Sequence, residues 1–145
     1  MILDQQFECA ETQIQTVIDS LFSLSSSFSI FCFSGDLGAG KTTLIRALCR
    51  QLGFNGKVSS PTYGLVNEYK LDNGKILFHS DWYRIEDAHE LVEAGIADNL
   101  HHSNGIWLIE WPEIGMEFIG STPYIQVQIS HKEHSRVYAI NAKRG

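Results

Sequence analysis

The sequence predicts a single α/β domain over residues 1–145, and three observations support this prediction. A short apolar run at residues 28–33 is typical of a strand that is buried on both faces. Residues 35–42, which read GDLGAGKT, place two glycines separated by four residues before a lysine and a hydroxyl residue. Apolar residues at helical spacing follow from Leu44 to Leu52 and end at Gly53. A strand, a glycine-rich loop and a helix in this order predict the P-loop NTPase fold, with a central mixed sheet, parallel and antiparallel, flanked by helices.

The residues of this loop predict a site for a nucleoside triphosphate. Glycines at positions 35, 38 and 40 let the main chain approach phosphate oxygens without a Cβ in the way. Lys41 would place a cation against the β- and γ-phosphates, and Thr42 is the natural ligand for Mg²⁺. A glycine-rich turn that only joins a strand to a helix is the alternative interpretation. The lysine, the threonine and both flanking elements in register argue against it.

The other elements are expected from local patterns. Apolar residues from Thr12 to Phe22 predict an amphipathic helix, with Thr12 and Gln15 placed as a capping box. The turn signal at residues 72–74 predicts a β-hairpin and therefore antiparallel pairing within the sheet. The further expected elements are a short strand before a polar loop that starts at Val58, two short helices within 86–100, a buried strand at 106–109, and a terminal hairpin over 124–129 and 137–140.

Composition and charge narrow the classes of function. The hydrophobic content of 43% is ordinary for a globular protein, no apolar run reaches the length of a membrane span, and the N-terminus does not read as a secretory signal. Three cysteines without close pairing favour free thiols and a cytoplasmic location. The formal net charge of −6 argues against a basic surface that would bind nucleic acid unaided. Any RNA that this protein serves is expected to be held by a partner.

Two carboxylates compete for the metal. Asp81 and Glu110 each follow an apolar strand, and strand ends are where open α/β sheets place ligands. We hypothesise that Glu110 coordinates Mg²⁺, directly or through water, and that Asp81 orients water or the metal's outer shell. The sequence does not decide which of the two carboxylates is the inner-shell ligand. Thr62, in a Ser-Pro-Thr loop, is either a sensor of the γ-phosphate or a plain turn hydroxyl.

The histidines predict no second metal site, and the nucleotide is expected to be ATP. No cysteine or acid completes a zinc set around the six histidines, so no metal besides Mg²⁺ is expected. A guanine-specifying Asn-Lys-x-Asp motif is absent from the sequence, which leaves ATP as the expected nucleotide and ADP as its product.

Four motifs in this order resemble the TsaE (YjeE) family of bacterial ATPases, which take part in threonylcarbamoyladenosine formation in tRNA. They are GDLGAGKTT at 35–43, SPT at 60–62, DWYR at 81–84 and IEWPE at 109–113. The resemblance implies a cytoplasmic P-loop ATPase that is weak alone and works with the TsaB and TsaD proteins. It also implies that TsaD transfers the threonylcarbamoyl group to the adenosine beside the anticodon of tRNAs that read codons beginning with A. The partners would then contact the tRNA, which agrees with the acidic charge.

The resemblance also implies roles for individual residues. Lys41 and Thr42 would hold phosphate and Mg²⁺, Glu110 would be a Mg²⁺ ligand, Asp81 would assist hydrolysis, and Thr62 would occupy a switch-like loop. The nucleotide-binding set implied in this way is Gly35, Asp36, Leu37, Gly38, Ala39, Gly40, Lys41, Thr42, Thr43, Thr12 and Arg136. Tyr63 and Trp82 depart from the family's usual phenylalanine and aliphatic residue, and both could alter the partner surface.

Two other functions are compatible with the same loop. A small-molecule kinase of P-loop type usually needs a lid with several arginines, and residues 86–104 contain none. A binding module that ATP switches without productive hydrolysis is the other alternative. Phosphate transfer to a second substrate would favour the first, and tRNA modification by a protein that binds but cannot cleave ATP would favour the second.

Overall fold

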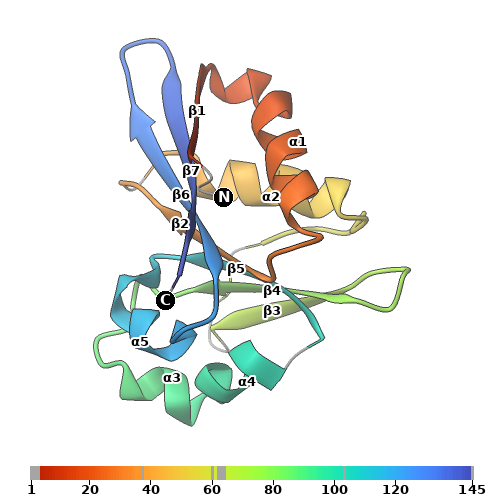
Figure 1. Ribbon diagram of the computed structural model, residues 1–145, viewed down its shortest axis with the longest axis vertical. Helices are drawn as coiled ribbons and strands as arrows, with labels where there is room; N and C mark the ends of the chain where they lie inside the picture. The colour runs from red at the N-terminus through yellow and green to blue at the C-terminus, as the bar shows by residue number, and fades with distance from the viewer. Residues whose placement is uncertain (1–3, 37, 60, 62–64, 103, 145) are drawn as a thin grey trace.

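The computed structural model describes residues 4–36, 38–59, 61, 65–102 and 104–144, and within them a single seven-stranded sheet organises the chain (Figure 1). The strand order across the sheet is β1-β7-β6-β2-β5-β4-β3. The strands are β1 (Asp4–Cys9), β2 (Ile30–Ser34), β3 (Val66–Lys70), β4 (Ile76–Asp81), β5 (Gly105–Glu110), β6 (Tyr124–His131) and β7 (Arg136–Lys143). The central strand β2 pairs in parallel with β5 and β6, and β4 pairs in parallel with β5. The outer pairs β1–β7, β6–β7 and β3–β4 are antiparallel, so the predicted mixed sheet is confirmed.

Helices cover both faces of this sheet. They are α1 (Gln15–Leu24), α2 (Lys41–Gln51), α3 (His89–Glu93), α4 (Ile96–His102) and α5 (Met116–Ile119), with short 3₁₀ turns η1 (Glu11–Gln13) and η2 (Pro112–Gly115). In Figure 1, α1 and α2 lie on one side of the sheet and α3, α4 and α5 on the other. Two separate clusters of buried side chains correspond to these two faces.

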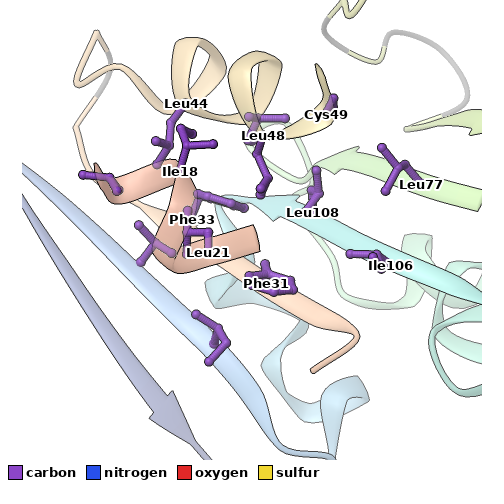
Figure 2. Packing of buried hydrophobic residues seen from close by; sticks show 14 of the residues in the cluster. Ile18, Leu21, Phe31, Phe33, Leu44, Leu48, Cys49, Leu77, Ile106 and Leu108 are labelled. Atoms are coloured by element: carbon purple, nitrogen blue, oxygen red, sulfur yellow. The ribbon is translucent and has the colours of Figure 1, made fainter. Parts of the chain in front are cut away.

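The α1–α2 face contains the larger core. Figure 2 shows side chains from the two helices, among them Leu21 and Leu48, meeting residues such as Phe33 and Leu108 of β2 and β5. These four side chains are inaccessible to solvent. The packing holds the first turn of α2 above the carboxyl end of β2, which is where the glycine-rich loop joins them.

The opposite face is built around two tryptophans. The Trp107 ring stacks on Phe78 with ring centroids 4.5 Å apart, and Trp82 is almost fully buried against the α3–α5 side. Gly115 lies directly beside Trp82, because a Cβ there would come within 2.5 Å of the indole ring. Trp82 therefore anchors the segment that follows Asp81.

Several expected elements are confirmed. The hairpin around residues 72–74 is β3–β4, the two short helices are α3 and α4, the strand at 106–109 is β5, and the terminal hairpin is β6–β7. None of the helices in the part of the chain that the structure describes has the length and apolar character needed to cross a membrane.

Two expectations about the first half of the chain were wrong, and one element was missed. The first helix begins at Gln15 rather than Thr12, and its N-cap Ile14 makes no capping hydrogen bond, because the chain leaves β1 through the 3₁₀ turn η1. The edge strand β1 was not predicted. The short strand expected just before Val58 is absent, since residues 52–59 form turns and loop. Val58 is a buried loop residue, and the nearby Phe54 ring stacks on Tyr69 with 4.4 Å between ring centroids.

Candidate functional site

A cavity of about 410 Å³ opens where the carboxyl ends of β4 and β5 meet the N-terminus of α2. Parallel strands deliver their terminal side chains to the same edge of a sheet, so this position follows from the topology. The residues that line it are Glu11, Gly38, Gly40, Lys41, Thr42, Thr43, Asp81, Tyr83, Glu110 and Trp111. The volume is in the range of small-ligand pockets, roughly 300–1,000 Å³.

The loop between β2 and α2 needs glycine at its first and last positions, for different reasons. A Cβ on Gly35 would come within 2.7 Å of the Ile129 carbonyl oxygen, so only glycine fits against β6. Gly40 is the N-cap of α2 and has φ of 102°, a left-handed conformation that glycine adopts without strain. The unpaired amides of the first turn of α2 thereby lie at the cavity, as in an anion site at a helix N-terminus.

Lys41 is the buried cation of the site. Its Nζ donates to the carbonyl oxygens of Gly35 (2.6 Å) and Asp36 (2.8 Å) and lies 4.3 Å from the centroid of the Trp111 ring. Burial lowers the pKa of the Lys41 ammonium, while the carboxylates of Glu110 and Asp81 act in the opposite direction. The loop carbonyls thus stabilise the charged side chain at the mouth of the glycine-rich loop.

The two candidate acids lie side by side on β4 and β5. Asp81 and Glu110 are register partners in the parallel pair. Thr42 Oγ1 donates to Glu110 Oε1 at 3.3 Å, whereas Asp81 Oδ1 accepts from the backbone amide of Tyr83 at 3.0 Å. Burial raises the pKa of Asp81, and the neighbouring Glu110 raises it further. The Thr42 hydroxyl and the Glu110 carboxylate are the oxygen donors that Mg²⁺ prefers, so these two residues fit a magnesium ion.

Glu11 lines the cavity on the side of β1 and β7, and Arg136 is bonded to it without lining the cavity itself. Arg136 Nη1 donates to Glu11 Oε2, and Nη2 donates to the Gly38 carbonyl oxygen at 3.4 Å. The pairing of β1 with β7 aligns Cys9 with Arg136, which brings η1 next to the glycine-rich loop. Thr12 also lies in η1, but it is exposed and does not line the cavity.

Two aromatic residues form the opposite rim. The Tyr83 and Trp111 rings are 4.9 Å apart between centroids and tilted by 46°, and Tyr83 is half-exposed. Trp111 has φ of 55°, a conformation that non-glycine residues rarely adopt. Such strain is concentrated at functional sites in proteins, because the surrounding structure must hold it in place.

The structure brings together most of the residues singled out from the sequence. Gly38, Gly40, Lys41, Thr42, Thr43, Asp81 and Glu110 line the cavity, Gly35 and Asp36 accept hydrogen bonds from Lys41, and Ala39 is buried behind the loop. Leu37 and Thr62 lie outside the described residues. The roles assigned to all of these residues stay predictions.

Sequence reasoning missed Glu11 and His79, which contact this set, and gave no site role to Tyr83 or Trp111, which also line the cavity. Glu11 carries no local signal, since it reaches the loop only through the pairing of β1 with β7. His79 Nε2 lies 2.8 Å from Glu110 Oε2. Its signal was the alternation of strand residues, which places positions 79 and 81 on the same face of β4.

Comparisons with known proteins agree on one family. The family model described as "Threonylcarbamoyl adenosine biosynthesis protein TsaE" matches residues 9–138. The tRNA threonylcarbamoyladenosine biosynthesis protein TsaE of Haemophilus influenzae is 44% identical over 103 residues, which cover 71% of this chain and 63% of that protein. The matched segment therefore spans less than two-thirds of the length of that relative. The protein of the same name from Borreliella burgdorferi is 33% identical over 112 residues, covering 77% of this chain and 80% of that protein.

A solved structure agrees at the level of the fold. The crystal structure of Bacillus subtilis YdiB covers 100% of this chain and 88% of its own, with a TM-score of 0.71 and 23% sequence identity. At this identity, the likeness supports a shared arrangement of helices and strands and nothing finer.

Proposed function

Because the chain belongs to the TsaE family of threonylcarbamoyl adenosine biosynthesis proteins, we propose that it binds ATP with Mg²⁺ in this cavity and hydrolyses it to ADP and phosphate. The hydrolysis would serve threonylcarbamoylation of tRNA. One observation supports the chemistry above all others: the N-terminus of α2, the Lys41 ammonium and the Thr42–Glu110 pair line the same cavity. These are the parts that phosphoryl transfer from a nucleoside triphosphate requires.

The glycine-rich loop and Lys41 would bind the β- and γ-phosphates. The amides at the start of α2 direct partial positive charge at the cavity, and the short Lys41 hydrogen bonds to loop carbonyls keep the ammonium at the loop. Phosphate oxygens would replace those carbonyls as acceptors of Lys41. Lys41 and the loop amides would stabilise the transition state, because negative charge then redistributes over the leaving and transferred groups.

Thr42 and Glu110 would hold the metal. Both present oxygen ligands to the cavity, with Thr42 Oγ1 and Glu110 Oε1 3.3 Å apart. When bound, Mg²⁺ supplies neutralisation of the β- and γ-phosphate charge. Asp81 would orient the attacking water, because one of its oxygens is fixed by the Tyr83 amide and its side chain lines the cavity.

The accessory role of the chain is also part of the proposal. TsaB and TsaD would be its partners, and tRNA would be reached through them.

The test is ATP hydrolysis by the purified chain, alone and with TsaB and TsaD. We expect slow phosphate release alone, faster release with the partners, and no detectable release from Lys41→Ala. Lys75→Ala is the matched control, since Lys75 is exposed on the β3–β4 turn and should leave the rate unchanged. Equal rates for Lys41→Ala and the unaltered protein would refute the assignment of the loop. Phosphate appearing on a second substrate instead of in water would point to a kinase.

A further inference from the structure

A buried histidine contacts the carboxylate assigned to the metal. The His79 side chain has 0% exposure and the Glu110 side chain 4%, and His79 Nε2 lies 2.8 Å from Glu110 Oε2. The other carboxylate oxygen, Oε1, accepts from the Thr42 hydroxyl. The two oxygens of Glu110 therefore have separate partners, one within the sheet and one at the cavity.

The fold places this contact by strand register. In the parallel pair of β4 and β5, His79 aligns with Leu108 and Asp81 aligns with Glu110. Alternate residues share one face of a strand, so Leu77, His79 and Asp81 all face the α1–α2 side. Leu77 and Leu108 belong to the core on that side. On this face of β4, His79 is thus the last buried side chain before the cavity, and it lies next to Glu110.

The contacts of the two ring nitrogens indicate which one of them donates to Glu110. An ionised Glu110 can only accept, so Nε2 must carry the proton that bonds to Oε2. Nδ1 is buried and has no hydrogen-bond partner among the described residues. A buried N–H without a partner is rarer than a buried acceptor without one. Nε2 is therefore the ring nitrogen that donates to Glu110.

We propose that His79 is a positioning residue for the metal site, whose Nε2–H fixes Glu110 Oε2 so that Oε1 is presented to Thr42 and to Mg²⁺. The inference rests on the proposed metal role of Glu110. Hydrogen bonds that hold a ligating carboxylate typically change metal affinity about 10–100-fold when removed. Without the His79 hydrogen bond, the carboxylate can rotate within its buried site, and its Oε1 is no longer directed at the cavity.

The experiment measures ADP binding by calorimetry with and without MgCl₂. His79→Leu removes the donor, and His79→Gln keeps an amide N–H near the position of Nε2. We expect His79→Leu to weaken binding of ADP in the presence of Mg²⁺ about 10–100-fold, to leave binding in its absence within about twofold, and His79→Gln to restore most of the loss. Leu77→Ala is the matched control, because it empties a buried site on the same strand without touching Glu110, and it should keep the Mg²⁺ effect.

Glu110→Gln separates this inference from the proposed function. If Glu110→Gln leaves the Mg²⁺ effect intact, the metal role of Glu110 fails, and the role of His79 fails with it. If Glu110→Gln abolishes the effect while His79→Leu preserves it, only the inference about His79 is overturned. Loss of the effect in Leu77→Ala as well would overturn it too, since general destabilisation would then explain the result.

A measurement on the unaltered protein guards against variants that do not fold. Nitrogen-15 NMR of the histidine rings reports which ring nitrogen carries the proton. We expect a proton on Nε2 of His79, the nitrogen that lies against Glu110. A proton on Nδ1 alone would remove the donor from Glu110 and overturn the inference.

Discussion

Asp81 and Glu110 are register partners with contrasting environments. Glu110 accepts from a histidine ring and from a hydroxyl, whereas within the described part of the chain the side chain of Asp81 accepts one hydrogen bond, from the Tyr83 amide. Burial raises the pKa of Asp81, and the neighbouring Glu110 adds to this effect. The folded state therefore holds an ionised Asp81 at the expense of stability. Carboxylates kept in such positions are candidates for function, because stability alone would remove them.

Replacing Asp81 by Asn should stabilise the folded protein at pH 7. Asn retains an oxygen that can accept from the Tyr83 amide and removes the charge beside Glu110. Because the pKa of Asp81 is raised on folding from 3.8, its penalty is fully present above the folded pKa and disappears as the pH falls below the unfolded value. Asp81 is only half-buried, so we expect a gain of at most about 1 kcal/mol, or about 3 °C in Tm.

The measurement is Tm against pH for both proteins. The difference between the two curves should shrink as the pH falls towards 3.8, the unfolded value. A Tm for Asp81→Asn that is lower at pH 7, or a difference that does not change with pH, would contradict this account. Hydrolysis by the variant should fall at the same time, since the carboxylate that is proposed to orient water is gone.

Among individual residues, the sequence predicts those that belong to one contiguous motif. Lys41 and Thr42 were identified because the loop, the preceding strand and the following helix are adjacent in sequence. Glu11 and His79 were not identified, because their contacts depend on strand pairing: Cys9 with Arg136 for the first and Asp81 with Glu110 for the second. Single-sequence reasoning has no access to register between distant strands.

At the scale of elements, the β4–β5 pair positions both candidate acids, and close approach of the two strands begins at Gly105. A Cβ on Gly105 would come within 2.1 Å of the Ile76 carbonyl oxygen and 2.9 Å of the Phe78 ring. The carbonyl belongs to the backbone of β4 and cannot move without shifting the strand. Gly105 therefore sets the separation and register at the start of the pair.

Gly105→Ala should destabilise the protein by about 1–3 kcal/mol, the usual cost of forcing extra atoms into a packed region. The displacement of β5 should also weaken binding of ADP with Mg²⁺, because β5 ends at Glu110. Urea unfolding measures the first effect and calorimetry the second. Gly56→Ala is the control, since its Cβ would meet only the outer atoms of the Phe54 ring, which can shift. Equal stability of the two variants would refute the close-approach argument.

Elements with local signals were predictable, and elements that depend on tertiary contacts were not. The β3–β4 hairpin follows from the turn at Asp72–Gly74, where Lys75 N donates to the Asn73 side chain. The edge strand β1 is polar in sequence and forms because β7 offers a free edge to pair with. Likewise, the capping pattern at Thr12 predicts an earlier helix start, but the approach of η1 to the loop overrides it.

At the scale of the whole molecule, charge is distributed unevenly around the sheet. The formal net charge is −6, and residues 86–104 contain no lysine or arginine. Five exposed acids of that segment lie over the α3–α4 side: Glu86, Asp87, Glu90, Glu93 and Asp98. The site itself is mixed in sign: Lys41 lines the cavity together with Asp81, Glu110 and Glu11, and Arg136 is paired with Glu11.

The isolated chain should therefore bind tRNA poorly, because phosphate contacts by basic side chains supply most non-specific affinity. We expect a Kd weaker than about 10⁻⁴ M at physiological salt, the weak limit of ordinary non-specific binding. Filter binding with labelled tRNA measures it, first with the chain alone and then with TsaB and TsaD, where retention of the chain with tRNA should appear. A double variant with Glu86→Lys and Glu93→Lys tests the physical cause, since it should bind more tightly at low salt only. Binding by the unaltered chain alone that is tight and insensitive to salt would show a dedicated RNA surface and would contradict recruitment through partners.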